Sequence, residues 1–99
     1  MLNDATVEDA KQIELDKLVP IVDNGSAIAG TCLDKISSQS RSIIDQADVI
    51  ISKGQANFET LSYCGKNVYY IFLCKCEMFA DRFKVPLYSG MFVNDLRLK

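Results

Sequence analysis

The sequence contains no histidine, and its four cysteines form no C-x-x-C pair. A structural zinc site typically uses two such cysteine pairs or adds histidines, so this pattern argues against zinc binding. Cys74 and Cys76 flank Lys75 at the end of an apolar run, a setting in which reduced and buried thiols are common. We therefore expect reduced cysteines at positions 32, 64, 74 and 76. Zinc binding, disulfide bonding and redox chemistry at residues 74–76 are the alternatives.

No apolar segment is long enough to cross a membrane as a helix. The longest run, Val68 to Cys74, has seven residues, whereas a spanning helix needs about 20. The first residues, Met1 to Ala5, lack the pattern of a signal peptide. A net charge of −2 and a pI near 4.9 argue against a nucleic-acid-binding platform, which needs clustered cations. We expect a soluble, cytoplasmic protein that binds neither nucleic acid nor membranes.

Apolar runs typical of buried strands alternate with segments typical of helices. The apolar fraction of 48% argues against disorder, and 99 residues suit one domain with a modest core. The pattern predicts a first helix that is opened by a capping box of Thr6 and Asp9 and ends near Leu15. A strand over 18–22, a loop over 23–26 and a helix within 33–46 follow. The second half is predicted to form a strand over 49–52, a helix over 55–63, a strand over 68–73, a helix over 77–83 and a short strand within 87–93. This alternation predicts an α/β fold with a largely parallel sheet and helices on both faces.

The segment from Asp48 to Glu59 carries the clearest functional signal. The run Val49–Ile51 lacks polar alternation and therefore indicates a buried strand. The strand ends at Lys53 and Gly54, where the glycine permits a tight turn before the next helix begins. A lysine at the carboxyl end of a buried strand, beside a glycine and a helix start, indicates an anion site. An ordinary strand-to-helix turn is the alternative, because the full glycine pattern of a nucleotide loop is absent.

Residues 47–61 resemble the hallmark segment of the damage-control metal-dependent phosphatases, a family long described as a domain of unknown function. The specific part is the stretch Lys-Gly-Gln-x-Asn-Phe-Glu. Three weaker segments follow the family's order: residues 2–6 with Asp9, residues 23–26 with Gly30 and Thr31, and residues 65–76. The resemblance extends over nearly the whole chain. It implies a three-layer, Rossmann-like core that belongs to a larger family domain.

The resemblance also implies a hydrolase that removes phosphate from phosphometabolites, such as sugar phosphates, with a divalent metal (manganese, magnesium, cobalt or nickel). In the family, an upstream Asp-Asn pair and an aspartate that matches Asp4 hold the metal. Lys53 and Asn57, with Gly54 beside them, match the phosphate and substrate pocket. The family's second, glycine-containing loop matches Asp23, Asn24, Gly25 and Ser26, on the substrate side.

The residue chemistry agrees with these implied roles. Oxygen ligands suit magnesium or manganese, and Lys53 would offset the charge of a phosphate. The alternatives are that Asp4 only caps a helix, that Asn57 is a solvated first-turn residue, and that Glu59 only interacts with the helix dipole. We further expect Asp4, the 23–26 loop and the Lys53–Gly54 turn to lie at one edge of the sheet, because ligands gather outside the carboxyl ends of parallel strands.

Family members are typically much longer, and the helical N-terminal region and upstream metal-binding pair are absent from this sequence. We therefore expect residues 1–99 to form a single α/β domain that corresponds to the C-terminal part of a family domain, truncated or one half of a split enzyme, and inactive alone. A non-catalytic interaction module is the alternative. The sequence has many large side chains for its length; Phe72 and Phe79 are expected in the core, and some of the others would form an exposed patch. That patch would bind a missing N-terminal portion or a second copy of the chain.

Overall fold

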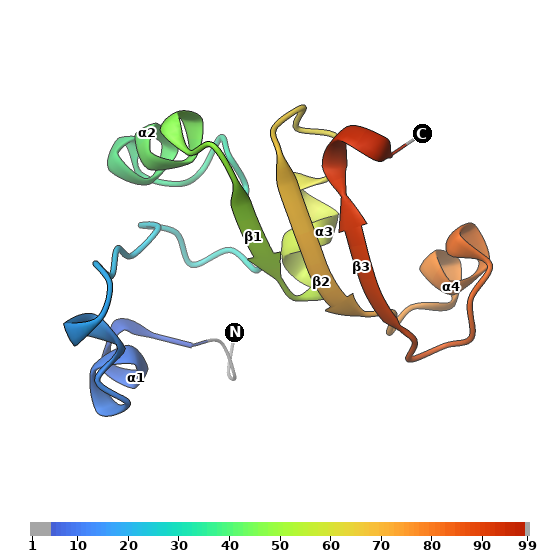
Figure 1. Ribbon diagram of the computed structural model, residues 1–99, viewed down its shortest axis with the longest axis horizontal. Coiled ribbons are helices and arrows are strands. Elements are labelled where there is room, and N and C mark those ends of the chain that lie inside the picture. Colours follow the sequence, from blue (N-terminus) through green and yellow to red (C-terminus); the bar gives the residue numbers. More distant parts are fainter. Residues whose placement is uncertain (1–4, 99) are drawn as a thin grey trace.

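The fold is organised around a three-stranded sheet, seen in the computed structural model, which describes residues 5–98 (Figure 1). The strands are β1 (Ile50–Lys53), β2 (Val68–Leu73) and β3 (Gly90–Asn94), in the spatial order β1-β2-β3. The helices are α1 (Val7–Gln12), α2 (Ser38–Gln46), α3 (Gln55–Leu61) and α4 (Glu77–Phe83), with 3-10 turns η1 (Leu15–Lys17) and η2 (Asp95–Arg97). The predicted α/β class is confirmed.

The sheet is mixed, so the expectation of a largely parallel sheet holds only for one pair. β1 and β2 are parallel, with Ile50 opposite Val68, whereas β2 and β3 are antiparallel. The antiparallel pairing has a local cause. The chain leaves β2 through α4 and returns beside the end of β2, where Tyr88 N donates to Cys74 O at 2.6 Å and Cys74 N to Ser89 O at 2.9 Å. β3 therefore starts where β2 ends and runs in the opposite direction.

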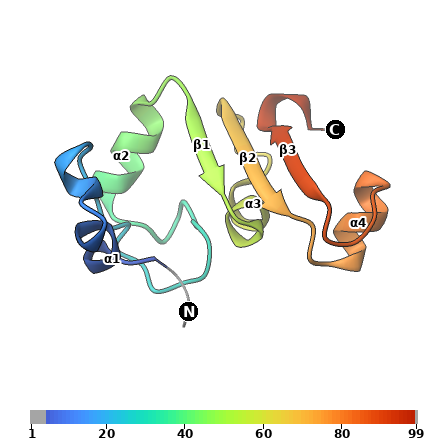
Figure 2. The same ribbon diagram turned by 60° about the horizontal axis from the view of Figure 1, so that its bottom comes forward.

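One face of the sheet carries the core. Figures 1 and 2 both place α3 behind β1 and β2. The α3 side chain Phe58 is fully buried and packs on the sheet, with its ring centroid 5.0 Å from that of Tyr70 and 4.6 Å from that of Phe72. From α4, Phe79 completes this aromatic cluster, 5.6 Å from Phe58. The predicted burial of Phe72 and Phe79 is confirmed.

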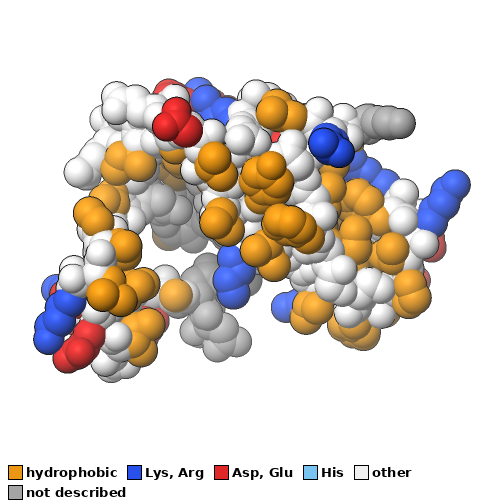
Figure 3. Space-filling model, viewed as in Figure 1, with side chains coloured by type: hydrophobic (Ala, Val, Ile, Leu, Met, Phe, Trp, Pro, Cys, Tyr) orange, Lys and Arg blue, Asp and Glu red, His pale blue; other side chains and the backbone are white. Residues whose placement is uncertain are grey.

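The opposite face of the sheet is apolar and exposed. We call it the open face and define it as Ile51, Tyr69, Ile71, Leu73 and Phe92. Along β2 these side chains alternate with the buried ones, as the pleat of a strand requires. Within residues 5–98 no helix covers this face, and Ile51 and Phe92 are 73% and 70% exposed. The expectation that Val49–Ile51 is a buried strand is therefore wrong: Val49 is 56% exposed as well, and of the three residues Ile50 packs against the core. Figure 3 shows hydrophobic side chains gathered over the strands on this side. The predicted helical layer on both faces is therefore present on one face only in the described part of the chain.

Several predicted boundaries are confirmed, and one predicted strand is wrong. Val68–Leu73 and Glu77–Phe83 form as predicted, and Thr6 and Asp9 make the expected capping box, with Thr6 N donating to Asp9 Oδ2 at 2.9 Å. Residues 18–22 form no strand: they are irregular, and Leu18 is 81% exposed. Pro20 removes a backbone donor there, and no described strand lies beside the segment to pair with it.

The remaining elements shift by a few residues. The first helix ends at Gln12 and is followed by η1. α2 begins only at Ser38, because the Ser37 side chain caps it by accepting a hydrogen bond from Ser40 N at 3.1 Å. The last strand begins at Gly90, after a turn. All four cysteines are free thiols, with Cys74 buried. No helix among residues 5–98 has the length and apolar character needed to span a bilayer.

Candidate functional site

The turn between β1 and α3 fixes the backbone around Lys53. Gly54 has φ +100°, a conformation that side-chain-bearing residues rarely adopt, which explains the glycine at this point. Gly54 N donates to Ile71 O at 2.9 Å, which ties the turn to β2. The Asn57 side chain closes the turn by donating from Nδ2 to Lys53 O at 2.7 Å. Lys53 therefore stands at the carboxyl end of β1 on a well-braced backbone, with its side chain exposed.

A second segment packs against α3 through Gly30 and Thr31. Gly30 has φ +78°, and a Cβ at this position would lie 2.5 Å from Ala56 O, so only glycine allows the approach. Thr31 Oγ1 donates to Asn57 Oδ1 at 2.8 Å, and Thr31 N donates to Thr60 Oγ1 at 2.8 Å. Asn57 thus joins the β1–α3 turn to this segment, using both ends of its amide. The Asn57 amide oxygen is therefore occupied by a hydrogen bond within the protein, and this bond helps to position the site.

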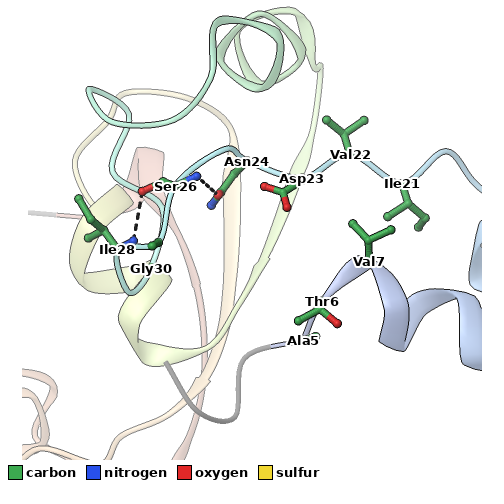
Figure 4. Close-up of a pocket in the computed structure, with 11 residues that line it drawn as sticks. Ala5, Thr6, Val7, Ile21, Val22, Asp23, Asn24, Ser26, Ile28 and Gly30 are labelled. Carbon is green, nitrogen blue, oxygen red and sulfur yellow. Dashed lines mark hydrogen bonds between the residues drawn. The ribbon is translucent and has the colours of Figure 1, made fainter.

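The loop over residues 23–26 is shaped by its own side chains. Asp23 Oδ1 accepts from Gly25 N at 2.6 Å, and Asn24 Oδ1 accepts from Ser26 N at 2.9 Å. Ser26 Oγ accepts from Ile28 N at 3.2 Å; Figure 4 shows this bond and the Asn24–Ser26 bond in succession along the loop. These are turns closed by short polar side chains. The loop is anchored to the start of α2, since Ser37 N donates to Asn24 O at 2.7 Å.

A cleft of about 690 Å³ opens beside the β1–α3 turn and brings several predicted site residues together. Its lining comprises Ala5, Asn24, Gly30, Thr31, Lys53, Gly54, Gln55, Ala56, Asn57, Glu59 and Lys75. We call it the lysine cleft. Asn24, Lys53, Gly54 and Asn57, all singled out from sequence, therefore face one space.

The other predicted residues lie to the side or outside the described structure. Asp23 and Ser26 line a neighbouring cavity of about 460 Å³, which shares Ala5, Asn24 and Gly30 with the lysine cleft. Gly25 lines neither of these two spaces. Asp4, the predicted metal ligand, lies outside residues 5–98. The 23–26 loop thus reaches the lysine cleft through Asn24.

Lys75 is a cleft residue that sequence reasoning missed. Lys75 follows the end of β2, and Lys53 ends the neighbouring parallel strand β1. Both lysines line the same cleft. Lys75 N donates to Gln55 Oε1 at 2.7 Å, and Gln55 Nε2 donates to Glu59 Oε1 at 2.8 Å. The signal was available: a lysine just after the apolar run 68–73 obeys the same strand-end rule that pointed to Lys53.

The charges around the lysine cleft favour an anion. Its charged residues are Lys53, Lys75 and Glu59. Among residues 5–98, no group of three or more histidine, cysteine, aspartate or glutamate side chains could hold a metal ion. The amide oxygens of Asn24 and Asn57 already accept hydrogen bonds from the protein. The described residues alone therefore do not fit a divalent metal, whereas the paired lysines fit a phosphate.

Known proteins share both the sequence and the fold of this chain. A damage-control phosphatase of Pyrococcus horikoshii is 41% identical over 87 residues, which are 87% of this chain and 30% of that protein. A damage-control phosphatase of Archaeoglobus fulgidus is 34% identical over 79 residues, 78% of this chain and 27% of that protein. The crystal structure of a DUF89 family protein from P. horikoshii superposes with a TM-score of 0.87 at 38% identity.

These matches cover 78% to 95% of this chain but only part of each relative. The structural superposition includes 95% of this chain and 33% of the P. horikoshii chain, so our chain spans about a third of the length of the relatives it matches. Residues 1–91 match the family described as Damage-control phosphatase ARMT1-like domain. The chain therefore belongs to the damage-control phosphatase ARMT1-like domain family, as the Lys-Gly-Gln-x-Asn-Phe-Glu stretch indicated.

Proposed function

We propose that this chain supplies the phosphate-binding part of a metal-dependent phosphatase that acts on small phosphometabolites such as sugar phosphates. The observation that carries the proposal is the lysine cleft, which Lys53 at the end of β1 and Lys75 just after the neighbouring parallel strand β2 both line. Ligands of α/β sheets gather at this edge. Family membership supplies the reaction class, because the named relatives are phosphatases.

In this proposal, each group in the lysine cleft has a separate task. The ammonium groups of Lys53 and Lys75 bind phosphate oxygens and offset charge that develops as the ester bond breaks. Asn57 positions Lys53, since it bonds the Lys53 carbonyl oxygen and the Thr31 hydroxyl. Asn24 presents the 23–26 loop to the part of the substrate beyond its phosphate.

The metal is not assigned a site among the described residues. Damage-control phosphatases depend on a metal, and manganese, magnesium, cobalt or nickel is proposed here. Asp4 remains the ligand that we propose from this chain, and the other ligands would come from the part of a family domain that this chain does not match. We therefore also propose that turnover requires that part, and that the complete enzyme is cytoplasmic.

A non-catalytic interaction module is the second candidate function. The open face favours it, because exposed apolar side chains on three neighbouring strands are typical of a surface that binds another protein. The two candidates differ in one measurable respect. The phosphatase proposal requires Lys53 for turnover, whereas a non-catalytic module would bind its partner and show no phosphatase activity that depends on Lys53.

The phosphatase proposal is tested by co-expressing this chain with the part of the P. horikoshii relative that it does not match. Hydrolysis of an aryl phosphate is then measured with manganese. Lys53→Ala removes a charge-assisted hydrogen bond worth about 1.5–3 kcal/mol, so kcat/KM should fall roughly ten- to 150-fold while metal affinity stays unchanged. Lys35→Ala, an exposed lysine outside the lysine cleft, is the matched control. If kcat/KM were unchanged in Lys53→Ala, Lys53 would be an ordinary strand-end residue with no role in phosphate binding.

A further inference from the structure

Two polar residues of the Lys-Gly-Gln-x-Asn-Phe-Glu stretch, Gln55 and Glu59, are joined to each other and to Lys75. They lie four positions apart in α3, a spacing that places both side chains on one side of the helix. Gln55 Nε2 donates to Glu59 Oε1 at 2.8 Å, and Gln55 Oε1 accepts from Lys75 N at 2.7 Å. All three residues line the lysine cleft. We call this pair of hydrogen bonds the Gln55 bridge.

The chemistry of the Gln55 bridge requires an amide in its middle. A backbone N–H, such as that of Lys75, can only donate a hydrogen bond, and a carboxylate can only accept one. A carboxamide has an acceptor at one end and a donor at the other, so Gln55 satisfies both neighbours in a single orientation. Glu59 therefore fixes which end of the Gln55 amide faces Lys75. A glutamate at position 55 would bring two carboxylates together, and an alanine there would remove both bonds.

The Gln55 bridge holds a part of the chain that the pairing of β1 with β2 does not reach. That pairing ends at Lys53 and Ile71, and Gly54 N adds one more bond to Ile71 O at 2.9 Å. Lys75 lies beyond this point, in the irregular segment between β2 and α4. The Gln55 side chain therefore extends the connection between the two parallel strands past the end of their backbone pairing.

The same turn thus positions both lysines of the cleft. From α3, Asn57 Nδ2 donates to the carbonyl oxygen of Lys53, and Gln55 Oε1 accepts from the backbone N–H of Lys75. Two ammonium groups bind one phosphate well only when their separation suits it, because a misplaced charge loses its hydrogen bond. A change at Gln55 is therefore expected to reach phosphate binding through the position of Lys75.

We propose that Gln55 and Glu59 are positioning residues for Lys75, and that the Gln55 bridge sets the separation of the two lysines that hold a phosphate. The inference rests on the proposed function in taking phosphate as the anion of the lysine cleft. Gln55 acts through the Lys75 backbone, and Glu59 acts through Gln55. The Lys-Gly-Gln-x-Asn-Phe-Glu stretch then works as one unit: its lysine binds the anion, its asparagine and glutamine hold the two backbones, and its glutamate orients the glutamine.

The first measurement follows the Lys75 backbone in the chain itself, by amide hydrogen exchange in NMR spectra. Gln55→Ala should speed the exchange of Lys75 N–H roughly tenfold, because this N–H loses its acceptor. The amide of Tyr70, in the core of the sheet, reports unfolding of the whole chain and should exchange at the wild-type rate. Gln46→Ala is the matched control, since it removes a side-chain bond of the same spacing, to Ser42 Oγ on α2. It should leave Lys75 unchanged.

The second measurement exchanges the two side chains of the Gln55 bridge, in the complex with the unmatched part of the P. horikoshii relative. Gln55→Glu alone sets two carboxylates against each other and should lower kcat/KM for an aryl phosphate roughly tenfold. Adding Glu59→Gln should restore kcat/KM to within about threefold of wild type, because the carboxylate at position 55 accepts from Lys75 N and from the amide at position 59. Gln55→Glu with Glu77→Gln restores only the net charge, at an exposed residue outside the cleft, and should stay impaired.

Three results would overturn the inference. The first is equal exchange of Lys75 N–H in wild type and Gln55→Ala. The second is faster exchange in Gln55→Ala with unchanged kcat/KM, because Lys75 would then need no positioning. The third is equal recovery of kcat/KM when Glu59→Gln or Glu77→Gln is added to Gln55→Glu, because net charge alone would then explain the effect. If the wild-type complex hydrolyses no phosphate ester while Lys75 exchange still depends on Gln55, the proposed function fails and the positioning of Lys75 stands.

Discussion

Lys53 and Lys75 reach the lysine cleft from backbones held in different ways. The carbonyl oxygen of Lys53 accepts from the Asn57 side chain, and the following Gly54 is tied to β2. Lys75 lies in the irregular segment after β2, where its backbone N–H donates to the Gln55 side chain. In both cases the main chain is fixed, and neither ammonium group forms an ion pair with another residue in the range 5–98. This is the arrangement expected for lysines that bind an anion.

Lys75 is therefore predicted to matter for substrate use nearly as much as Lys53. In the co-expressed complex, Lys75→Ala should lower kcat/KM roughly ten- to 150-fold, because the change removes a second charge-assisted bond of about 1.5–3 kcal/mol. Lys75→Arg should retain part of the efficiency, since the positive charge and the backbone bond to Gln55 remain. Steady-state kinetics with an aryl phosphate measures both variants. If only Lys53→Ala impairs turnover, Lys75 lies at the rim of the site without contacting phosphate.

Asp95 is the buried charged residue at the far end of the sheet, and its role is structural. It is 4% exposed and accepts hydrogen bonds from Tyr63 N at 2.8 Å, Gly65 N at 3.0 Å and Tyr70 Oη at 2.7 Å. It thereby joins η2 to the turn after α3 and to β2. Burial, together with the hydrogen bond to Asp95, raises the pKa of Tyr70 above its ordinary value, so its hydroxyl remains a donor.

Asp95→Asn is predicted to destabilise the fold without any effect on the lysine cleft. An amide cannot accept at both of its ends, so one of the backbone donors would lose its partner, at a cost of about 1–3 kcal/mol. Urea unfolding of the isolated chain should show a lower midpoint with an unchanged slope. Asp34→Asn, an exposed position, should leave the midpoint where it is. Equal midpoints for Asp95→Asn and wild type would show that the network adds no stability.

At the scale of elements, the site depends on how closely residues 28–31 approach α3. This contact fixes Asn57 between two segments that are far apart in sequence. It rests on Gly30, whose missing side chain leaves room for the Ala56 carbonyl oxygen. The sequence does not show why position 30 must be glycine, because the Ala56 carbonyl oxygen that a side chain would meet is brought there only by the fold.

Gly30→Ala and Gly65→Ala form a matched pair that separates crowding from backbone strain. The two glycines have φ +78° and +80°, but a Cβ at position 65 meets no atom within 4 Å, whereas one at position 30 lies 2.5 Å from Ala56 O. Gly65→Ala should cost about 1 kcal/mol for its conformation. Gly30→Ala should cost more and should also lower kcat/KM in the complex, because α3 and Asn57 must move. Urea unfolding and kinetics on both variants check this; equal losses would mean that the close contact relaxes freely.

The elements also show how far the sequence determines this structure. β2 and α4 formed with the predicted bounds, because a continuous apolar run and a helical segment that stops before Pro86 are local signals. Residues 18–22 have a strand-like composition but no neighbouring strand, and a strand forms only where backbone groups are paired. The direction of β3 was missed for a similar reason, since it depends on a return turn. Lys53, Gly54 and Asn57 were found from one motif, whereas Lys75 was missed although it follows an apolar run just as Lys53 does.

For the whole molecule, the main feature is the imbalance between one filled and one open sheet face. A sheet buried on both sides is the norm for α/β folds, and here the second layer is not among the described residues. The relatives are about three times as long as the region they share with this chain. The lysine cleft borders the open face, since Lys53, Gly54, Gln55 and Lys75 line both the cleft and a groove beside the exposed strands.

The isolated chain is accordingly predicted to hydrolyse phosphate esters little or not at all with manganese or cobalt. It provides the lysines and one proposed metal ligand, Asp4, and a divalent metal bound by a single protein carboxylate is held weakly. Purified chain is assayed with an aryl phosphate and compared with the co-expressed complex. Robust turnover by the chain alone that is abolished by Asp4→Ala would contradict this prediction.

The β1–α3–β2 unit has a consequence for how the molecule folds. Ile50 pairs with Val68 across a single short helix, so these contacts close a small loop, while most of the Phe58 cluster lies within or just after the same stretch. Small loops cost little chain entropy and close early. This unit is thus expected to be structured in the folding transition state, before the segment bearing Gly30 docks. The nascent domain would then form the β1–α3 turn that carries Lys53 before Gly30 closes against α3.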